Sequence, residues 1–563
     1  MAESSQSEMP QCYDSPGVLL TILHFNDVYE IEPRAEDPVG GATRFATALK
    51  QFSPLNPLVV FSGDCLNPSL LSTVTKGKHM LAVFNELGVH CAVYGNHEFD
   101  FGVDILEELA PQMNFPWFLS NVYDKFTSQP LGRGAVSSIL EWNSVKIGLM
   151  GLVEEEWLDT LGTVDKSNID YVDYVVTANQ LSKELRENGA ELVIAMTHMK
   201  WCNDMRLASE TKAVDLILGG HDHDYRVVVV NGTLIVKSGS DFRYLTKIDV
   251  VRNHDMTYKY GTQKVIIEKT FEEDPSVKKI VTEFTANLQY LLEEVLVRTE
   301  KDLDGCFSTV RKSESNLGNL IANAMLEATH ADVALLNSGT LRSDRIHPAG
   351  PLAMRDLMQI LPIPDPVLVV QATGQQLLEA LENGVSSYPH LDGRFPQVAG
   401  IQFGFDPRAK SGHRVSADSV KVQGQYLEKN KTYLLAIKEY LAKGKDGYEM
   451  FLNCPRIFDV ETAQTLPTIL INHFESVKII QGLKVCKSGH RMGLIKVSNS
   501  ASFTAFEENT HEKTQIAVVP GVEGRIYHIS QEQERHLREL RAAREENAFP
   551  AGFNSVNHKP ISD

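Results

Sequence analysis

Five clusters of acidic, amide and histidine side chains, each placed just after a short apolar run, constrain this chain most strongly. Runs such as Leu58–Phe61 and Leu216–Leu218 are typical of strands buried on both faces of a sheet. Because ligands of open α/β sheets gather beyond the carboxyl ends of the strands, we expect the five clusters to lie together. The clusters are Asp27, Gly63-Asp64, Gly95-Asn96-His97-Glu98-Phe99-Asp100, Thr197-His198 and Gly219-Gly220-His221-Asp222-His223.

The chemistry of these side chains predicts a metal centre. Carboxylate oxygens, amide oxygens and imidazole nitrogens are ligands for hard or borderline divalent metals. Two such metals about 3.5–4 Å apart are a common device for in-line attack on phosphate esters. A single Gly-Asp pair or histidine would be weak evidence, since both are common in turns and cores. Five such clusters, each at the end of a predicted strand, are stronger evidence for a metal centre than any one of them.

Bulk properties limit the class of protein. A chain of 563 residues with 43% hydrophobic and 23% charged residues is expected to form two large, soluble, globular domains. No apolar stretch reaches the about 20 residues of a membrane span, and the polar start and end predict neither a signal peptide nor a lipid anchor. The net charge of −19 argues against nucleic acid or an anionic membrane as partner. Seven scattered cysteines without a CxxC pair favour a reducing, cytoplasmic compartment.

Patterns along the chain predict its domains. Residues 1–17 are expected to be a flexible lead, and residues 18–273 alternate strand-like and helical patterns, which predicts a layered α/β domain with a central sheet. Asp274-Pro275 begins a connecting helix over 274–299, with an acidic N-cap followed by proline and apolar residues at helical spacing as far as Val295. A second domain is expected over 300–530, and a polar helix and tail over 531–563.

The order of the five clusters resembles that of the calcineurin-like metallophosphoesterases. The second half resembles the carboxyl-terminal domain of 5'-nucleotidases, so the chain is identified as a member of the 5'-nucleotidase/UDP-sugar hydrolase family over roughly residues 18–530. The resemblance implies an α/β fold: a layered metallophosphoesterase domain with a second, α+β substrate-binding domain. It also implies a two-metal phosphomonoesterase that hydrolyses nucleoside 5'-monophosphates or related nucleotides by attack of a metal-bound hydroxide. Two divalent ions, zinc or manganese, are the implied cofactors.

The resemblance assigns a role to each cluster. One metal takes Asp64, Asn96, His198 and His221, and the other takes Asp27, the bridging Asp64 and His223. His221 and His223 lie two residues apart, and at a strand-end loop they can diverge to serve two metals. His97 and Asp100 match the family's catalytic pair. The imidazole would stabilise charge on the phosphoryl oxygens, and the carboxylate would orient the ring.

One position in the metal site departs from the family pattern. The family has Asp-x-His at the first strand, whereas this chain has Asp27-Val28-Tyr29. Three explanations stay open: Tyr29 ligates a metal as a phenolate, water fills the vacant ligand position, or Tyr29 shapes the pocket wall. The second and third are favoured, because a phenol has a pKa near 10. His24 is expected to be a buried strand histidine rather than a substitute ligand.

The second domain carries residues that resemble the family's substrate site. Arg311, Asn337 and Arg342 match segments that bind substrate, and Asp446 matches an aspartate that contacts the ribose. Arginine suits this work because its planar fork binds anions and hydroxyls directionally. The two ring positions that clamp the nucleobase fall here on Tyr440, which can stack, and on an isoleucine, Ile363, which cannot.

These departures leave two alternatives. The first is a phosphatase that acts on a non-nucleotide phosphate such as a sugar phosphate, because Ile363 offers no π face. The second is a catalytically weakened binding or regulatory homologue, because Tyr29 replaces a ligand. In each of these interpretations the ligand is a small-molecule phosphoester. The sequence does not predict the oligomeric state.

Overall fold

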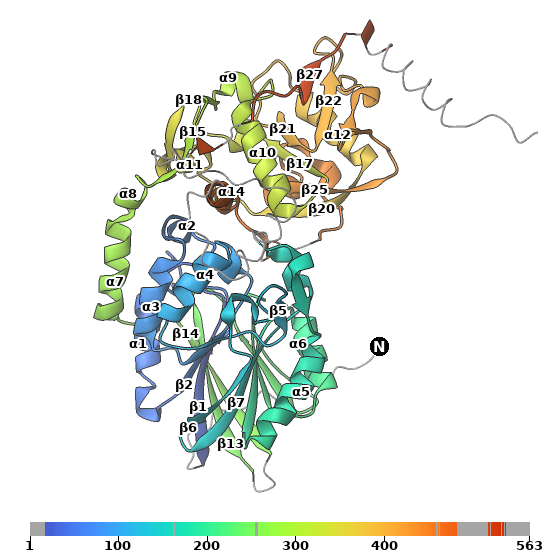
Figure 1. The fold of residues 1–563 in the computed structure, drawn as a ribbon. Coiled ribbons are helices and arrows are strands. Elements are labelled where there is room, and N and C mark those ends of the chain that lie inside the picture. Colours follow the sequence, from blue (N-terminus) through green and yellow to red (C-terminus); the bar gives the residue numbers. More distant parts are fainter. Residues whose placement is uncertain are drawn as a thin grey trace, which may run out of the picture. The chain divides into compact units, whose positions relative to one another are not determined.

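A computed structural model describes residues 17–161, 164–253, 257–457, 460, 462–480, 516–517, 520–530, 532–533 and 535 (Figure 1). The chain divides into two compact units, each described here by itself. The described residues within 1–301, 349–368 and 458–518 form the first unit, and those within 302–348, 369–457 and 519–563 form the second. The described residues within 349–368 and 458–518 therefore belong to the first unit, whereas the sequence pattern places them in the second domain. The predicted lead and tail lie almost entirely outside the described residues.

In the described part of the first unit, two six-stranded sheets pack face to face. The first has the order β14-β13-β1-β2-β3-β4 and the second the order β11-β12-β10-β9-β7-β6. β1, β2, β3 and β4 run parallel, as do β7, β9, β10 and β12, and the remaining strands are antiparallel. The strands are β1 (Val18–Phe25), β2 (Leu58–Phe61), β3 (Cys91–Val93), β4 (Trp117–Phe118), β6 (Ser137–Trp142), β7 (Val145–Val153), β9 (Leu192–His198), β10 (Leu216–Gly220), β11 (Tyr225–Val230), β12 (Thr233–Ser238), β13 (Tyr244–Arg252) and β14 (Tyr258–Ile266).

Helices cover the outer face of each sheet and give four layers (Figure 1). The outer face of the first sheet packs on α1 (Ala42–Lys50), α3 (Lys78–Leu87) and α4 (Val103–Leu109), and α7 (Pro275–Ala286) packs on α1 and α3. The second sheet packs on α5 (Tyr174–Glu187) and α6 (Trp201–Glu210). Between the sheets, Ile22 and Val60 meet Ile194 and Leu218 in an apolar core.

The layered α/β class is confirmed, but the domain has two sheets where one central sheet was expected. A strand buried against helices on one face and another sheet on the other is apolar on both faces. Its sequence therefore cannot be told from that of a strand between two helix layers.

The connecting segment also differs from the prediction beyond its first turn. Asp274 caps α7 as expected, because its carboxylate accepts from the backbone N–H groups of Ser276 and Val277 at 3.0 and 3.1 Å. The helical run ends sooner, with α8 (Leu288–Leu291), and residues from Val295 form the strand β15 (Val295–Thr299). In the described residues β15 lies in a three-stranded sheet with β19 (Gly350–Ala353) and β26 (Ile516–Ala517). The first unit also holds α2 (Leu70–Thr75), α11 (Met354–Ile360), α14 (Leu466–Ile480), β5 (Val122–Asp124) and β8 (Ile169–Tyr171).

The second unit is built around two four-stranded sheets in its described residues. One has the order β20-β25-β17-β21 and the other the order β24-β23-β22-β27. α10 packs on β17 and β21. The strands are β16 (Leu303–Asp304), β17 (Val333–Asn337), β18 (Ile346–His347), β20 (Val367–Thr373), β21 (Pro396–Ala399), β22 (Ile401–Phe405), β23 (Lys421–Val422), β24 (Gln425–Tyr426), β25 (Thr432–Lys438) and β27 (Ile526–His528). The helices are α9 (Phe307–Val310), α10 (Asn316–Thr329), α12 (Gly374–Val385) and α13 (Glu439–Ala442). No described helix in either unit is long and apolar enough to span a bilayer.

Candidate functional site

The predicted ligands lie at the carboxyl ends of strands from both sheets of the first unit. Asp27, Asp64 and Asn96 follow β1, β2 and β3 of the first sheet, while His198 ends β9 and His221 follows β10 of the second. Asp27, Asp64 and His221 have positive φ angles of 54°, 68° and 78°. Such backbone is costly for non-glycine residues and collects at functional sites, where the surrounding structure enforces it.

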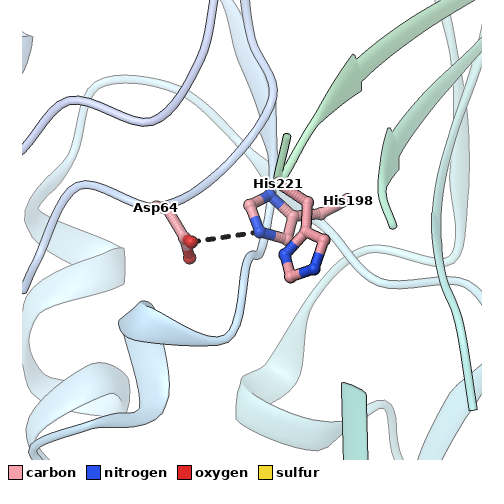
Figure 2. Close-up of side chains that lie close together, drawn as sticks. All are labelled: Asp64, His198 and His221. Carbon is pink, nitrogen blue, oxygen red and sulfur yellow. Dashed lines mark ion pairs between the residues drawn. The ribbon is translucent and has the colours of Figure 1, made fainter. Parts of the chain in front are cut away.

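Asp64, His198 and His221 form a buried cluster whose ligand atoms all lie within 4.8 Å of one another (Figure 2). His198 Nε2 is 3.1 Å from Asp64 Oδ2. The other ring nitrogen, Nδ1, donates to the backbone carbonyl of Ser62 at 2.8 Å. A backbone carbonyl that accepts from one imidazole nitrogen fixes the tautomer and leaves the second nitrogen to bind a metal.

Unpartnered polar atoms show that this donor set fits a divalent metal. Asn96 Oδ1 and His221 Nε2 are buried without a hydrogen-bond partner among the described residues, and His198 Nε2 lies against the Asp64 carboxylate. Leaving a buried acceptor unsatisfied costs about 1–3 kcal/mol, so these two acceptors need another partner. A metal held by a carboxylate, an amide and two imidazoles would satisfy them.

The two histidines differ in protonation. Burial alone would lower the pKa of His198, but the neighbouring Asp64 carboxylate outweighs it and raises this pKa to about 9. Burial, with the positive charges of His198 and Lys237, holds the pKa of His221 well below its usual value. His198 therefore carries a proton that a metal would displace, and His221 is ready to ligate as neutral imidazole.

The second proposed ligand pair, Asp27 and His223, lies beside Tyr29. His223 Nε2 is 3.5 Å from Asp27 Oδ1. The Tyr29 hydroxyl lies 2.9 Å from that nitrogen, 3.1 Å from that oxygen and 3.4 Å from Asp64 Oδ2. As expected of a strand-end loop, His221 and His223 diverge, the first towards His198 and the second towards Tyr29.

The Tyr29 phenol is kept neutral in this position. Burial raises its pKa well above its usual value, and the Asp27 and Asp64 carboxylates raise it further. The ring also packs edge-on against His97, with 5.7 Å between ring centroids. These contacts favour the interpretation that Tyr29 shapes the pocket wall over the interpretation that it is a phenolate ligand.

His97 and Asp100 are paired as the resemblance implied. His97 Nδ1 donates to Asp100 Oδ2 at 2.7 Å, and Asn67 donates to the same oxygen at 2.6 Å. Gln464 Nε2 donates to Asp100 Oδ1 at 3.0 Å, and the Asn472 amide donates to the Asp100 carbonyl. The carboxylate that orients His97 is therefore itself held by several donors. The His97 backbone N–H donates to Asp64 Oδ1 at 2.8 Å, which links the pair to the metal cluster.

Several residues that serve the site had no predicted role. Glu98 lies within the third cluster and accepts from the backbone N–H groups of Asp64, Cys65 and Gly95 at 2.7–2.9 Å, which ties two ligand loops together. The position of Glu98 in the Gly-Asn-His-Glu motif could have indicated this role from the sequence. No sequence pattern indicated the roles of Gln464 and Asn472, because both lie more than 360 positions from Asp100 in the sequence.

His24 is a buried strand histidine, as expected, and it supports the site from beneath. Its Nδ1 and Nε2 lie 2.7 and 2.9 Å from the hydroxyls of Ser238 and Ser62. Burial lowers its pKa to about 3, so the ring is neutral. With both nitrogens engaged by hydroxyls, His24 does not take the place of the missing ligand.

In the second unit, three of the predicted substrate residues form one hydrogen-bonded group. Asp446 Oδ2 accepts from Asn337 Nδ2 at 2.8 Å, and Asp446 Oδ1 accepts from the Tyr440 hydroxyl at 2.8 Å. Asp446 has a positive φ of 54°. A carboxylate fixed by two donors in strained backbone is pre-organised to accept further hydrogen bonds from hydroxyl groups.

The two predicted arginines lie close enough to interact. Burial lowers the pKa of Arg311, and the positive charge of Arg342 lowers it further. Arg311 also stacks on Phe307, with its guanidinium carbon 3.7 Å from the ring centroid, and its buried Nε has no hydrogen-bond partner among the described residues. Two like charges held together, with an unused buried donor, suit an anionic ligand.

The two base-clamp positions fall in different units. Tyr440 belongs to the second unit and is 37% exposed, whereas Ile363 belongs to the first and is 51% exposed. Each side chain is accessible to a ligand, and only Tyr440 offers a ring for stacking.

Comparison with known proteins gives matches to two families. Residues 20–225 match the calcineurin-like phosphoesterases, and residues 295–453 match the 5'-nucleotidase C-terminal domain. The chain is 28% identical to the snake venom 5'-nucleotidase of Naja atra over 488 residues, which cover 77% of this chain and 91% of that protein. It is 27% identical to the human 5'-nucleotidase over 77% of this chain and 84% of that protein.

A longer relative and a solved structure complete the comparison. The chain is 28% identical to the trifunctional nucleotide phosphoesterase YfkN of Bacillus subtilis, over 77% of this chain but only 32% of that much longer protein. The NAD nucleotidase of Haemophilus influenzae has a similar fold, with a TM-score of 0.65 and 18% identity over 91% of this chain and 99% of that one. A calcineurin-like phosphoesterase match followed by a 5'-nucleotidase C-terminal domain match, together with relatives named 5'-nucleotidase, makes this chain similar to the 5'-nucleotidases in both of its parts.

Proposed function

We propose that this protein is a metal-dependent phosphomonoesterase that hydrolyses nucleoside 5'-monophosphates or related nucleotides. The observation that carries the proposal is the buried Asp64, His198 and His221 cluster, which is hydrogen-bonded through Asp64 to the backbone of His97. A metal-binding cluster beside an oriented imidazole is the arrangement that phosphoester hydrolysis needs.

The metal-binding residues divide into two sets. Asp64, Asn96, His198 and His221 would hold one ion, and Asp27, Asp64 and His223 the other. When bound, the ions would supply an activated water and neutralise charge on the phosphoryl group. We propose zinc or manganese, since both accept mixed oxygen and nitrogen ligands.

The other side chains of the site prepare it for the reaction. Asp100 accepts from His97 Nδ1, so in its doubly protonated form the imidazole is oriented with Nε2–H as the group that can donate to a phosphoryl oxygen. That donation becomes stronger as negative charge builds in the transition state. Glu98 holds the Asp64 and Gly95 backbone in place, so the site needs little reorganisation during turnover.

Recognition of the nucleoside is proposed for residues of the second unit. The Asp446 carboxylate would accept from ribose hydroxyls, with Asn337 and Tyr440 holding it. The Tyr440 ring would stack on the base, and Arg311 and Arg342 would bind anionic or polar groups. Stacking of one base on one aromatic ring contributes about 1–3 kcal/mol in nucleic-acid binders, which is enough to favour nucleotides over phosphates without a base.

A non-nucleotide phosphate is the second candidate substrate, and Ile363 favours it. This exposed aliphatic side chain stands where the family has a second aromatic ring, so the base would stack on one face only. A sugar phosphate needs no such clamp and could still use Asp446 and the arginines.

A substrate panel separates these candidates. Purified protein reconstituted with zinc, manganese or cobalt would be assayed for phosphate release from AMP, UMP, UDP-glucose, phosphoglycerate and p-nitrophenyl phosphate. A preference for a nucleoside monophosphate supports the main proposal, and activity only on non-nucleotides moves the substrate class and keeps the mechanism. No release with any metal would favour a binding or regulatory homologue.

Location and partners are also proposals. We propose a cytoplasmic protein that acts on a small phosphoester and binds neither nucleic acid nor membranes, on the grounds of the acidic charge and the scattered cysteines. Fractionation of cells that express the full chain tests the compartment, and light scattering determines the oligomeric state.

A further inference from the structure

Lys237 is a fully buried lysine beneath the metal-binding loops, and none of the roles above uses it. It lies on β12 with 0% of its surface exposed. We infer that Lys237 is a positioning residue, whose ammonium group sets the spacing between the strand end that carries His198 and the loop that carries His221 and His223. The inference rests on the proposed assignment of these histidines as metal ligands.

Four oxygens surround the Lys237 ammonium group, and three of them come from the two ligand segments. Nζ donates to the carbonyl of Met199 at 2.6 Å and to the carbonyl of Gly220 at 2.8 Å. It also forms ion pairs with Asp222 Oδ2 at 2.5 Å and with Asp204 Oδ2 at 2.9 Å.

The places of these partners in the sequence explain the role. Met199 directly follows His198, and Gly220 directly precedes His221. Asp222 lies between His221 and His223. One buried cation therefore contacts a residue next to every histidine of the two proposed ligand sets, through the backbone at Met199 and Gly220 and through the side chain at Asp222.

The neighbouring residues accommodate this contact. A Cβ atom at Gly219 would lie 3.0 Å from Lys237 Cε, so glycine leaves room for the lysine stem. Asp204, on α6, is fully buried and also accepts from Thr197 Oγ1 at 2.6 Å, which ties the cluster to the residue before His198. A buried charge is tolerated only when it is paired and hydrogen-bonded, and here both conditions hold.

The lysine stays charged in this environment. Burial would lower its pKa, but the carboxylates of Asp204 and Asp222 outweigh burial and raise it above the usual value. A neutral side chain of the same length would leave two carbonyls and two carboxylates without their donor. The two ligand segments would then be free to separate, and the preformed spacing of the imidazoles would be lost.

Metal affinity is the property that this loss should change. Replacing an outer partner of metal ligands typically costs about 10–100-fold in affinity or activity. We expect Lys237→Met to raise the dissociation constant for Mn²⁺ or Zn²⁺ by about that factor. Turnover should recover at saturating metal, because every ligand is still present.

Two further variants make the test specific. Asp222→Asn removes only the negative charge with which the loop of His221 and His223 pairs to Lys237. Asp222 is partly exposed, so this variant keeps the inference testable where Lys237→Met does not fold. Lys247→Met is the matched control. Lys247 is also buried, and it pairs with Asp249, which accepts from Thr21 Oγ1 at 2.8 Å; none of these residues adjoins a ligand.

The experiment measures metal dissociation constants of the full chain by competition with a chromophoric chelator, beside thermal unfolding of the same samples. We expect weaker binding in Lys237→Met and Asp222→Asn, and binding within about twofold of wild type in Lys247→Met at a comparable loss of stability. Folded Lys237→Met and Asp222→Asn proteins with wild-type affinity would overturn the inference. A wild-type chain that binds no metal would instead overturn the proposed function.

Discussion

Replacing Gln464 by alanine should slow turnover about tenfold without weakening metal binding. Gln464 lies just before α14, and its Nε2 donates to Asp100 Oδ1 at 3.0 Å and to the Asp100 carbonyl at 3.4 Å. The first of these bonds holds the carboxylate that orients His97. The variant leaves the metal ligands unchanged, so it separates the orientation of the imidazole from the binding of metal.

The magnitude follows from the partners of Asp100. A hydrogen bond to a charged group contributes about 1.5–3 kcal/mol. Asp100 Oδ2 keeps His97 and Asn67 in the variant, so the carboxylate is loosened rather than released. We therefore expect the variant to lose transition-state stabilisation equal to the lower limit of that range, about 1.5 kcal/mol, which lowers kcat slightly more than tenfold. The free energy of unfolding should fall by about 1.5–3 kcal/mol.

The assay compares kcat, KM and metal affinity of Gln464→Ala with those of Asn472→Ala. Among the described residues Asn472 donates to the Asp100 backbone carbonyl and not to its carboxylate, so its loss should destabilise the fold and leave kcat within about threefold of wild type. Equal kcat values for Gln464→Ala and wild type would refute the reasoning. An equal loss of kcat in both variants would show that turnover depends on the position of the Asp100 backbone and not on the hydrogen bond to its carboxylate.

Substitutions at three further positions have expected outcomes. Tyr29→Phe should leave metal affinity within a few-fold of wild type and Tyr29→His should increase it, as measured by chelator competition; a drop of a hundredfold in Tyr29→Phe would identify Tyr29 as a ligand. Burial lowers the pKa of His79 from its usual 6.5 to about 3. The unfolded chain therefore binds the additional proton between these values, and the contribution of His79 to stability, complete above pH 6.5, falls as the pH falls towards 3. The free energy of unfolding, measured by denaturant at a series of pH values, should change with pH less steeply in His79→Gln than in wild type between pH 3 and 6.5. The difference in slope should reach up to about 1.4 kcal/mol per pH unit, and equal slopes would contradict the lowered pKa of His79. Asp446→Ala should raise KM for a nucleoside monophosphate about tenfold or more and leave KM for p-nitrophenyl phosphate unchanged, whereas equal rises would place Asp446 outside nucleoside recognition.

The candidate metal centre could be predicted because its geometry follows from strand ends. Asp27, Asp64 and Asn96 each follow a parallel strand, and parallel strands of one sheet end at one edge. His198 and His221 follow the same rule in the second sheet. Residue type and position after an apolar run were enough to bring together side chains that are distant in sequence.

The rest of the site depends on contacts that no local pattern encodes. Gln464 reaches Asp100 because the chain returns to the first unit after passing through the second. Lys237 occupies a central strand, where a lysine contradicts the apolar pattern and only its buried partners explain it. The end of the connecting helix was also missed, because Val295 fits both a helical face and the strand that it forms.

Calorimetric titration of the wild-type chain and of Asp64→Ala with Mn²⁺ or Zn²⁺, with phosphate release from AMP measured at each step, tests the central claim most directly. The account predicts two metal equivalents in wild type, with activity that rises as the second is bound. It also predicts at most one equivalent and at least about a thousandfold less activity in Asp64→Ala, where the proposed bridging carboxylate and the contact to His97 are both lost. Activity in wild type that does not depend on added or retained metal, or full activity in Asp64→Ala, would contradict it.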